Sequence, residues 1–290
     1  MFAEACRKAA EFTRPVVIST RHQNGEVRTE CGTFTVINRD GWMVTAAHLY
    51  DSMAKFQSDQ NKIAEVKALN EKRAQDSEPE IRLDPDLITN HSMWWGWDGV
   101  FVEEVRINRQ VDLAVAKLKG FSPSMVREYP VLRDPETLRP GTSLCRMGFP
   151  FVNINATFDE SSGSFRIPSI PARETVFPND GIHTRTISNG KTADGKYDCL
   201  YVETSTPGLK GQSGGPIFDT EGRLYAIQVQ TRHIPMDLHP TAVYDGTTMV
   251  ENQFMNVGMG VHIATVRKML DDCGAEYCAE GDESGFRIID

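Results

Sequence analysis

Hydrophobic and polar residues alternate over short stretches along most of the chain, and turn signals separate one stretch from the next. This pattern is typical of half-buried β-strands. The predicted strands cover residues 16–18, 27–38, 42–45, 100–107, 111–118, 142–149, 200–204, 224–230 and 255–263. Many short strands with few helices predict an all-β fold, either a barrel or a sandwich.

Three stretches have helical spacing instead. Residues 1–12 predict a short helix that packs on the outside of the body. Between residues 49 and 76, apolar side chains recur at nearly helical intervals among Lys and Glu, which predicts one long helix or a helical pair inserted into the β framework. Residues 264–272 predict a closing amphipathic helix, and the acidic tail after it is expected to be loosely held.

Two other stretches differ in composition from their surroundings. Residues 93–97 contain Trp94, Trp95 and Trp97. We interpret these rings as packing against the β framework rather than as a ligand surface. Residues 151–198 are rich in Gly, Pro, Asn, Asp and Ser, which favours long loops with only short strands.

Charge and cysteine content exclude several classes of function. The formal net charge of -9 and the pI near 5.3 argue against a nucleic-acid-binding protein, which would carry a basic surface. No apolar run approaches the length of a membrane span, and residues 1–10 show no secretion signal. The six cysteines include no Cys-x-x-Cys pair, so we expect no metal site and free thiols in a reducing, cytoplasmic compartment.

Candidate chemistry centres on a serine between glycines, in the segment Gly211-Gln212-Ser213-Gly214-Gly215-Pro216. Glycines permit a tight backbone that can direct several N–H groups to one point beside the hydroxyl. Acyl transfer needs such a nucleophile together with a base and an orienting carboxylate. His48, after a predicted strand, and Asp112, at the start of another, are the candidates. Each residue alone has an ordinary structural explanation, but three in this order do not.

The segments Thr45-Ala46-Ala47-His48, Val111-Asp112-Leu113-Ala114-Val115 and Gly211–Pro216 together resemble the chymotrypsin/trypsin-like serine peptidases, in the chain order of that family. The resemblance implies two packed antiparallel β-barrels within one peptidase domain. Its parts are residues 12–120 with the insertion 49–76 after the histidine, residues 138–272 with the closing helix, and an acidic tail at 273–290.

The resemblance also assigns roles. Ser213 would be the nucleophile, His48 the general base and Asp112 the residue that orients the histidine. The backbone N–H groups of Gly211 and Ser213 would form the oxyanion hole. The chemistry would need no cofactor and no metal, and the substrate would be a protein or peptide.

Gln212 departs from the secreted members of the family, which carry an aspartate at this place. That aspartate pairs with a new N-terminus after zymogen cleavage, and an amide cannot form the ion pair. Together with the run Thr206–Lys210, the run Val257–Val261 and the lack of flanking cysteines, this resembles the bacterial HtrA-type branch. Only about twenty residues follow the last predicted helix, too few for a PDZ domain.

By the same resemblance, the substrate pocket would be lined by Pro207, Val229, Thr231 and Gly260. No Asp or Glu lies where a trypsin-type pocket base would be, roughly at Pro207, which disfavours cleavage after Arg or Lys. Because Gly260 would leave the pocket open, the sequence predicts a preference for a medium apolar side chain.

Three functional hypotheses follow. The first is a serine endopeptidase that acts through an acyl-enzyme. The second is a protease-fold module that binds peptides with weak or no catalysis. The third is a conditional protease controlled by a regulatory protein partner, with the insertion at 49–76 and the Trp94–Trp97 stretch as the features to probe. None of the three involves nucleic acid or a membrane.

Overall fold

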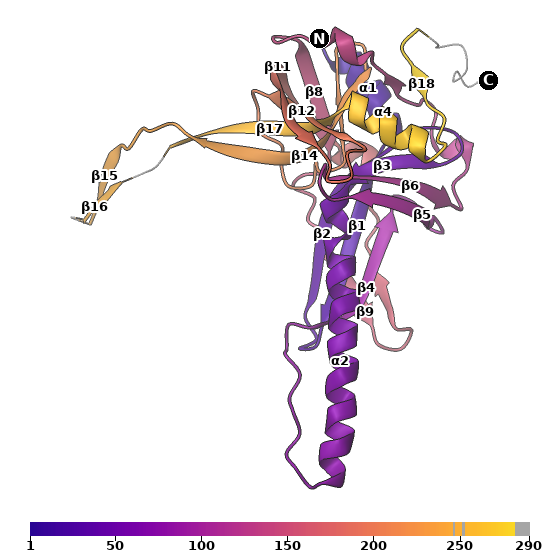
Figure 1. The fold of residues 1–290 in the computed structure, drawn as a ribbon, viewed down its shortest axis with the longest axis vertical. Coiled ribbons are helices and arrows are strands. Elements are labelled where there is room, and N and C mark those ends of the chain that lie inside the picture. The colour runs from indigo at the N-terminus through magenta and orange to yellow at the C-terminus, as the bar shows by residue number, and fades with distance from the viewer. Residues whose placement is uncertain (246, 251–252, 282–290) are drawn as a thin grey trace.

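The computed structural model describes residues 1–245, 247–250 and 253–281, and most of its strands belong to two large sheets (Figure 1). The N-terminal sheet has six antiparallel strands in the order β4-β1-β2-β3-β6-β5. These strands are β1 (Thr13–His22), β2 (Val27–Val36), β3 (Trp42–Ala46), β4 (Ile88–Trp95), β5 (Phe101–Asn108) and β6 (Leu113–Lys119).

The second sheet has the order β13-β8-β11-β12-β17-β14-β7-β18, and β13 also pairs with β14. This additional pairing closes the strands from β13 to β14 into a ring, here called the C-terminal barrel. The strands of this sheet are β7 (Val131–Leu132), β8 (Ser143–Gly148), β11 (Phe177–Lys191), β12 (Asp198–Thr204), β13 (Pro216–Phe218), β14 (Leu224–Pro235), β17 (Phe254–His262) and β18 (Cys278–Ala279). The predicted all-β fold with two trypsin-like halves is confirmed.

One hydrophobic core runs through both halves. It joins Phe34 and Val115 of the N-terminal sheet to Leu224 and Val261 of the C-terminal barrel. A smaller cluster fills the barrel interior, around Val202 and its neighbours. The two sheets therefore form a single folded unit, and a loop between them can be held from both sides.

The helices lie outside the sheets. They are α1 (Ala3–Phe12), α2 (Asp51–Gln75), α3 (Ala172–Thr175) and α4 (Ile263–Asp272), with short 3-10 turns at Ala47–Tyr50, Pro123–Met125 and Pro135–Thr137. The predicted insertion is one continuous helix, α2, which projects from the body (Figure 1). Within the described ranges, no helix is long and apolar enough to cross a membrane.

α2 is anchored to the N-terminal sheet near its first turns. The buried carboxylate of Asp59 accepts a hydrogen bond from the N–H of Ile88 at 3.0 Å. Only Asp59 and Ile63 of this helix are buried. Most of α2 therefore does not pack against the two sheets, and its side chains are accessible to solvent.

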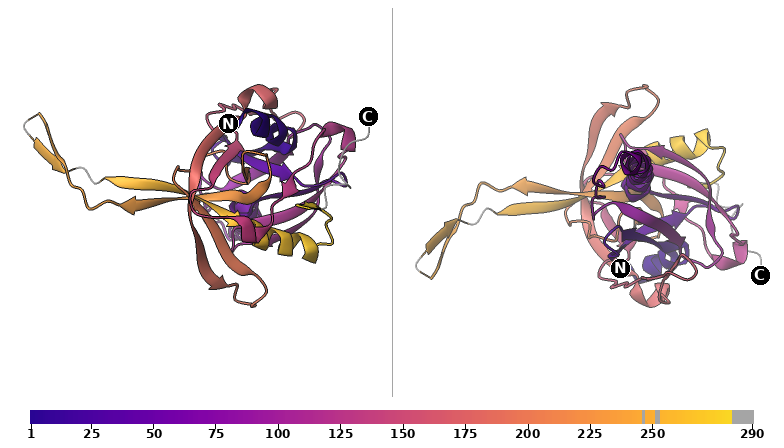
Figure 2. Two further views of the ribbon diagram at one scale, coloured as in Figure 1. Left: turned by 90° about the horizontal axis from the view of Figure 1, so that it is seen from above. Right: turned by 90° about the horizontal axis from the view of Figure 1, so that it is seen from below.

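Only one strand of the long arm formed by β14 and β17 was predicted: the strand expected at 255–263 matches β17, but the extension of β14 to Pro235 is absent from the prediction. Both strands extend beyond the barrel, and a hairpin of β15 (Thr241–Tyr244) and β16 (Thr247–Val250) lies farther along the same arm (Figures 1 and 2). The predicted strand ended at residue 230 because the sequence that follows has no regular alternation. Backbone pairing from Thr231↔Gly258 to Pro235↔Phe254 continues the ladder, although residues 231–235 of β14 bury no side chain.

Two other expectations need correction. In residues 151–198, short strands were expected around Phe165 and Thr184–Ile187; the structure has the hairpin of β9 (Thr157–Asp159) and β10 (Ser164–Arg166) and, instead of a second short strand, the 15-residue β11. β11 buries only His183, so its alternation is not visible in the sequence.

The first part of the tail is also not loosely held. Ala275 and Cys278 are buried, and β18 runs parallel to β7. Glu280 forms ion pairs with Arg133 and Arg223 at 2.7 and 2.8 Å. Residues 282–290 of the predicted acidic tail lie outside the described residues. All six cysteines carry free thiols.

Trp95 and Trp97 pack against the β framework as predicted, whereas Trp94 donates its Nε1–H to Asp98 in an exposed contact. Trp95 is buried, with its ring centroid 5.4 Å from that of Phe34 in an edge-to-face arrangement. Trp97 also contacts Phe34, and the guanidinium of Arg14 lies 5.0 Å from the Trp97 ring centroid. These rings close one end of the N-terminal sheet.

His262 gives the fold a predictable pH dependence. Burial, with nearby His183 as a smaller cause, lowers the pKa of His262 to about 4. The unfolded chain takes up this proton near pH 6.5, so between about pH 6.5 and 4 the unfolded state binds more protons. We expect the free energy of unfolding to fall by roughly 3 kcal/mol as the pH drops through this window.

The matched variant is His262→Asn. The Nδ1 atom of His262 accepts a hydrogen bond from the N–H of Ala264 at 3.2 Å and caps α4. Asparagine can keep this cap without titrating. Urea unfolding near neutral pH and at about pH 4 would measure the difference between the two proteins. An equal pH dependence in both would contradict the assignment.

Candidate active site

His48 and Asp112 are brought together by the pairing of β3 with β6. His48 lies in the 3-10 turn directly after β3, and Asp112 immediately precedes β6. The register Ala46↔Leu113 places the two residues at the same end of the ladder. The Nδ1 atom of His48 lies 2.8 Å from Oδ2 of Asp112, and the His48 N–H donates to Oδ1 at 2.9 Å.

These contacts select one tautomer of the neutral imidazole. A carboxylate oxygen of Asp112 accepts from Nδ1–H of His48, and in that tautomer Nε2 carries the lone pair. Asp112 holds a left-handed backbone conformation with φ of 59°, a region that aspartate tolerates better than most residues. Both side chains are partly exposed, at 39% and 30%, so substrate can reach the imidazole.

The serine loop connects β12 to β13 and is attached to the N-terminal sheet. Thr33 of β2 donates its N–H to the carbonyl of Ser213 at 2.9 Å and its hydroxyl to the carbonyl of Gly211 at 2.6 Å. Gly211 and Gly214 have φ of 99° and 87°, which glycine adopts without strain. A Cβ on Gly214 would lie 3.0 Å from the backbone nitrogen of Ala46, two residues before His48.

The N–H groups of Gly211 and Ser213, predicted to form the oxyanion hole, have no hydrogen-bond acceptor among the described residues. Gln212 between them is fully buried. Its Oε1 accepts from the N–H of Leu209 at 2.9 Å, and its Nε2 donates to the carbonyl of Phe177 at 3.3 Å. The buried amide of Gln212 therefore ties the serine loop to Leu209 and Phe177. From the sequence, Gln212 was identified only as a replacement for the aspartate of secreted family members.

Ser213 and His48 lie on adjacent segments but are not hydrogen-bonded. In the part of the chain that is described, no bond joins Ser213 Oγ to His48 Nε2. Contacts between nucleophile and base are often long before substrate binds.

Two of the four expected pocket residues lie in or contact residues 205–209, the first part of the serine loop. Thr231 donates its hydroxyl to the carbonyl of Gly208 at 2.7 Å. The carbonyl of Pro207 accepts from the side chain of Asn179 at 2.9 Å. Both contacts fix the course of this segment.

The other two expected pocket residues, Val229 and Gly260, do not face residues 205–209. Val229 packs in the main core, and its neighbour Gln228 lies against Gly208 instead. Gly260 faces the barrel interior, because a Cβ there would lie 2.6 Å from Cδ1 of Ile217. Neighbouring residues of a strand point to opposite faces of the sheet. An error of one position in the predicted alignment therefore assigns Val229 to the place that Gln228 occupies.

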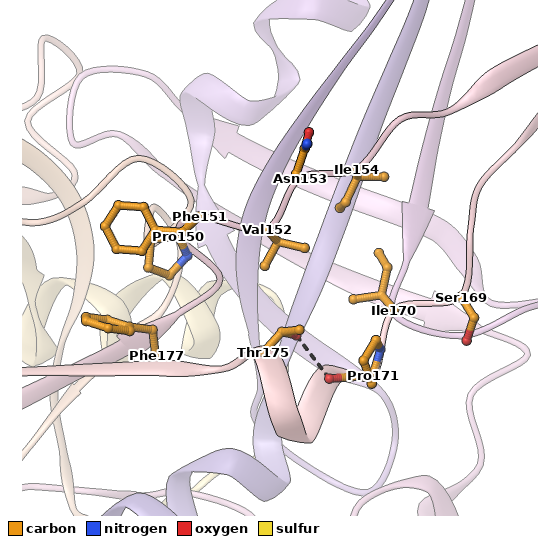
Figure 3. Close-up of a pocket in the computed structure, with 10 residues that line it drawn as sticks. All are labelled: Pro150, Phe151, Val152, Asn153, Ile154, Ser169, Ile170, Pro171, Thr175 and Phe177. Atoms are coloured by element: carbon orange, nitrogen blue, oxygen red, sulfur yellow. Dashed lines mark hydrogen bonds between the residues drawn. The ribbon is translucent and has the colours of Figure 1, made fainter.

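An apolar pocket that the sequence did not predict lies beside the serine loop (Figure 3). Its volume is about 460 Å³. Pro150 and Phe177 join it to the loop, because a Cβ on Gly211 would lie 3.0 Å from Cα of Pro150 and Phe177 accepts the bond from Gln212. The lining residues are Pro150, Phe151, Val152, Asn153, Ile154, Ser169, Ile170, Pro171, Thr175 and Phe177.

Comparisons with known proteins were made for the whole chain. Among solved structures, the HtrA-type protease AlgW with a tripeptide has a TM-score of 0.48 and 13% identity, and the match covers 94% of this chain and 63% of that one. The chain thus spans less than two thirds of that protein's length. The active form of the Rv3671c protease from M. tuberculosis has a TM-score of 0.49 and 15% identity, with 94% and 86% covered.

A search of curated proteins finds no match. At the level of families, residues 32–227 match the model of the trypsin-like peptidase domain. That range contains the histidine turn, the aspartate and the serine loop. The chain therefore belongs to the trypsin-like peptidase family.

Proposed function

We propose that this protein is a serine endopeptidase that hydrolyses peptide bonds of protein substrates with Ser213, His48 and Asp112. The observation that carries the proposal is the double hydrogen bond between His48 and Asp112, which leaves Nε2 as a base on the segment that packs against the serine loop. Family membership supports the same chemistry.

In the first half-reaction, Ser213 Oγ attacks the carbonyl carbon of the scissile bond while Nε2 of His48 takes the hydroxyl proton. The carbonyl oxygen becomes an oxyanion. When the C–N bond breaks, His48 gives the proton to the leaving amine, and an ester on Ser213 remains. Water then attacks this ester with the same base, which releases the carboxylic acid and restores the serine.

Three features of this chain lower the barrier. Asp112 keeps the hydrogen on Nδ1 and stabilises the positive imidazolium that forms at each step. The N–H groups of Gly211 and Ser213 can donate to the oxyanion, and each such donor contributes roughly 3 kcal/mol in comparable sites. The apolar pocket beside Gly211 can hold a side chain of the substrate next to the scissile bond.

A fluorophosphonate probe tests the nucleophile directly, because it forms a covalent bond only with an activated serine. We expect the wild-type protein to be labelled at Ser213, and Ser213→Ala to show no labelling. Ser124→Ala, at an exposed turn, is the matched control and should label like wild type. Unlabelled wild-type protein, or labelling that survives Ser213→Ala, would refute the proposal.

The missing hydrogen bond between Ser213 and His48 favours one alternative, a peptide-binding module with weak catalysis that a partner could activate. α2 begins three residues after His48 and is mostly exposed. A protein that binds this helix could therefore change the position of the His48 imidazole. Removal of the exposed part of α2 with its following loop should leave the labelling rate unchanged if no such control exists.

A further inference from the structure

Outside the proposed triad, Arg146 is unusual because its charged side chain is almost completely buried. It lies on β8, is 1% exposed, and extends into the C-terminal barrel. One terminal nitrogen, Nη2, contacts the hydroxyls of Thr204 and Thr206. Its Nε and Nη1 atoms have no hydrogen-bond partner among the described residues.

No carboxylate neutralises this arginine within the described ranges. Glu203, next to Thr204 on β12, is engaged by Arg185 at 2.9 Å. Burial lowers the pKa of Arg146 to about 10, so the guanidinium is still charged at neutral pH. A buried charge with two unsatisfied hydrogen-bond donors raises the free energy of the folded state. An anion bound next to the guanidinium would remove part of this cost.

The surroundings of Arg146 belong to the segment that leads to the nucleophile. Thr204 ends β12, and the chain continues through Thr206 and Gly208 to the serine loop. Opposite Thr204, Gly258 of β17 makes room for the guanidinium, because a Cβ there would lie 2.7 Å from Cζ of Arg146. Residues 205–209 are only half-buried, so a substrate side chain can approach from this side.

Gln228 connects the same region to Ser213. Its carbonyl accepts from the N–H of Gly214 at 2.7 Å, and its own N–H donates to the carbonyl of Gly215 at 2.8 Å. Its side chain lies against Gly208, and Oε1 of Gln228 is also a buried atom without a partner in the described part of the chain. Gln228 pairs with Gly260, which is on the same face of β17 as Gly258.

These contacts define one region, bounded by residues 204–208, β14 and β17, in which buried, unpartnered polar atoms of Arg146 and Gln228 lie against the segment that leads to the nucleophile. A carboxylate matches the fork of a guanidinium and accepts two hydrogen bonds from it. We propose that this region is the specificity subsite, and that the enzyme cleaves after glutamate or aspartate. This proposal rests on the proposed peptidase function and replaces the apolar preference expected from the sequence.

Matched peptides that differ only in the residue before the scissile bond test the proposal. We expect wild-type kcat/KM for the Glu peptide to exceed that for the Gln peptide by roughly 10- to 100-fold, the range for a charge-assisted hydrogen bond. Arg146→Met should abolish this ratio and raise the relative rate for a Leu peptide, and Arg146→Lys should keep part of it. Arg82→Met, at an exposed loop position, should leave the ratio unchanged.

A purely structural role for Arg146 predicts a different result, in which Arg146→Met slows all peptides equally and keeps their order. That result, or wild-type preference for Leu or Gln over Glu, would overturn the proposal while fluorophosphonate labelling of Ser213 still upheld the peptidase function.

Binding gives a readout without catalysis. By calorimetry, Ser213→Ala should bind a blocked peptide ending in Glu at least about 10-fold more tightly than one ending in Gln. Adding Arg146→Met should remove the difference. Equal binding of both peptides to Ser213→Ala would overturn the proposal even if the enzyme proved inactive.

Discussion

Replacement of Ser213 by alanine is expected to lower kcat for peptide hydrolysis by roughly 10⁶-fold, because no other group can form the acyl-enzyme. The loop itself should survive the change. Its bonds to Thr33 use the backbone carbonyls of Gly211 and Ser213, and its glycine conformations do not involve the serine side chain. The free energy of unfolding should therefore change little.

Kinetics on a peptide substrate, with thermal unfolding of the same preparations, would check both parts. Ser124→Ala should behave as wild type. If Ser213→Ala retained about a tenth of the wild-type kcat, another nucleophile would have to be sought and the roles given to His48 and Asp112 would lose their basis.

Replacement of Asp112 by asparagine is expected to lower kcat by about 10⁴-fold. Asparagine tolerates the left-handed backbone at this position, so the fold is retained. Its amide has one acceptor oxygen where Asp112 uses two, for the N–H and the Nδ1–H of His48. When the amide NH₂ faces Nδ1, the imidazole must carry its hydrogen on Nε2 and cannot act as the base.

Asp84→Asn is the matched control, since Asp84 is an exposed loop residue that accepts a hydrogen bond from the N–H of Asp86. It should keep full activity. A loss of less than about tenfold in Asp112→Asn would show that the carboxylate does not orient His48 during catalysis, whatever the resting geometry.

The sequence was sufficient where side chains alternate against a core. β2, β3 and β6 of the N-terminal sheet and the strand that ends at Thr204 were predictable, and so was the chain order of His48, Asp112 and Ser213. β4, which adds Trp95 to the core, was not predicted as a strand. Strands stabilised mainly by backbone pairing were also missed, because β11 buries only His183 and residues 231–235 of β14 bury no side chain.

The surroundings of the site were less predictable than its reactive groups. An arginine within a predicted strand usually marks a solvent-exposed face. At Arg146 both faces of β8 are buried, because Cys145 meets Cys6 of α1 at 3.9 Å while Arg146 enters the barrel. Only the tertiary arrangement shows this. The prediction of Val229 where Gln228 lies has the same origin, since the strand register decides which side chains point to which face of a sheet.

The threonines of β2 that hold the serine loop lie 178 and 179 positions before their acceptors in the chain. Contacts between residues this far apart form late in folding, because the intervening chain must first lose its freedom. The serine loop therefore has these bonds only when both halves are present and docked. A fragment with the C-terminal half alone lacks them.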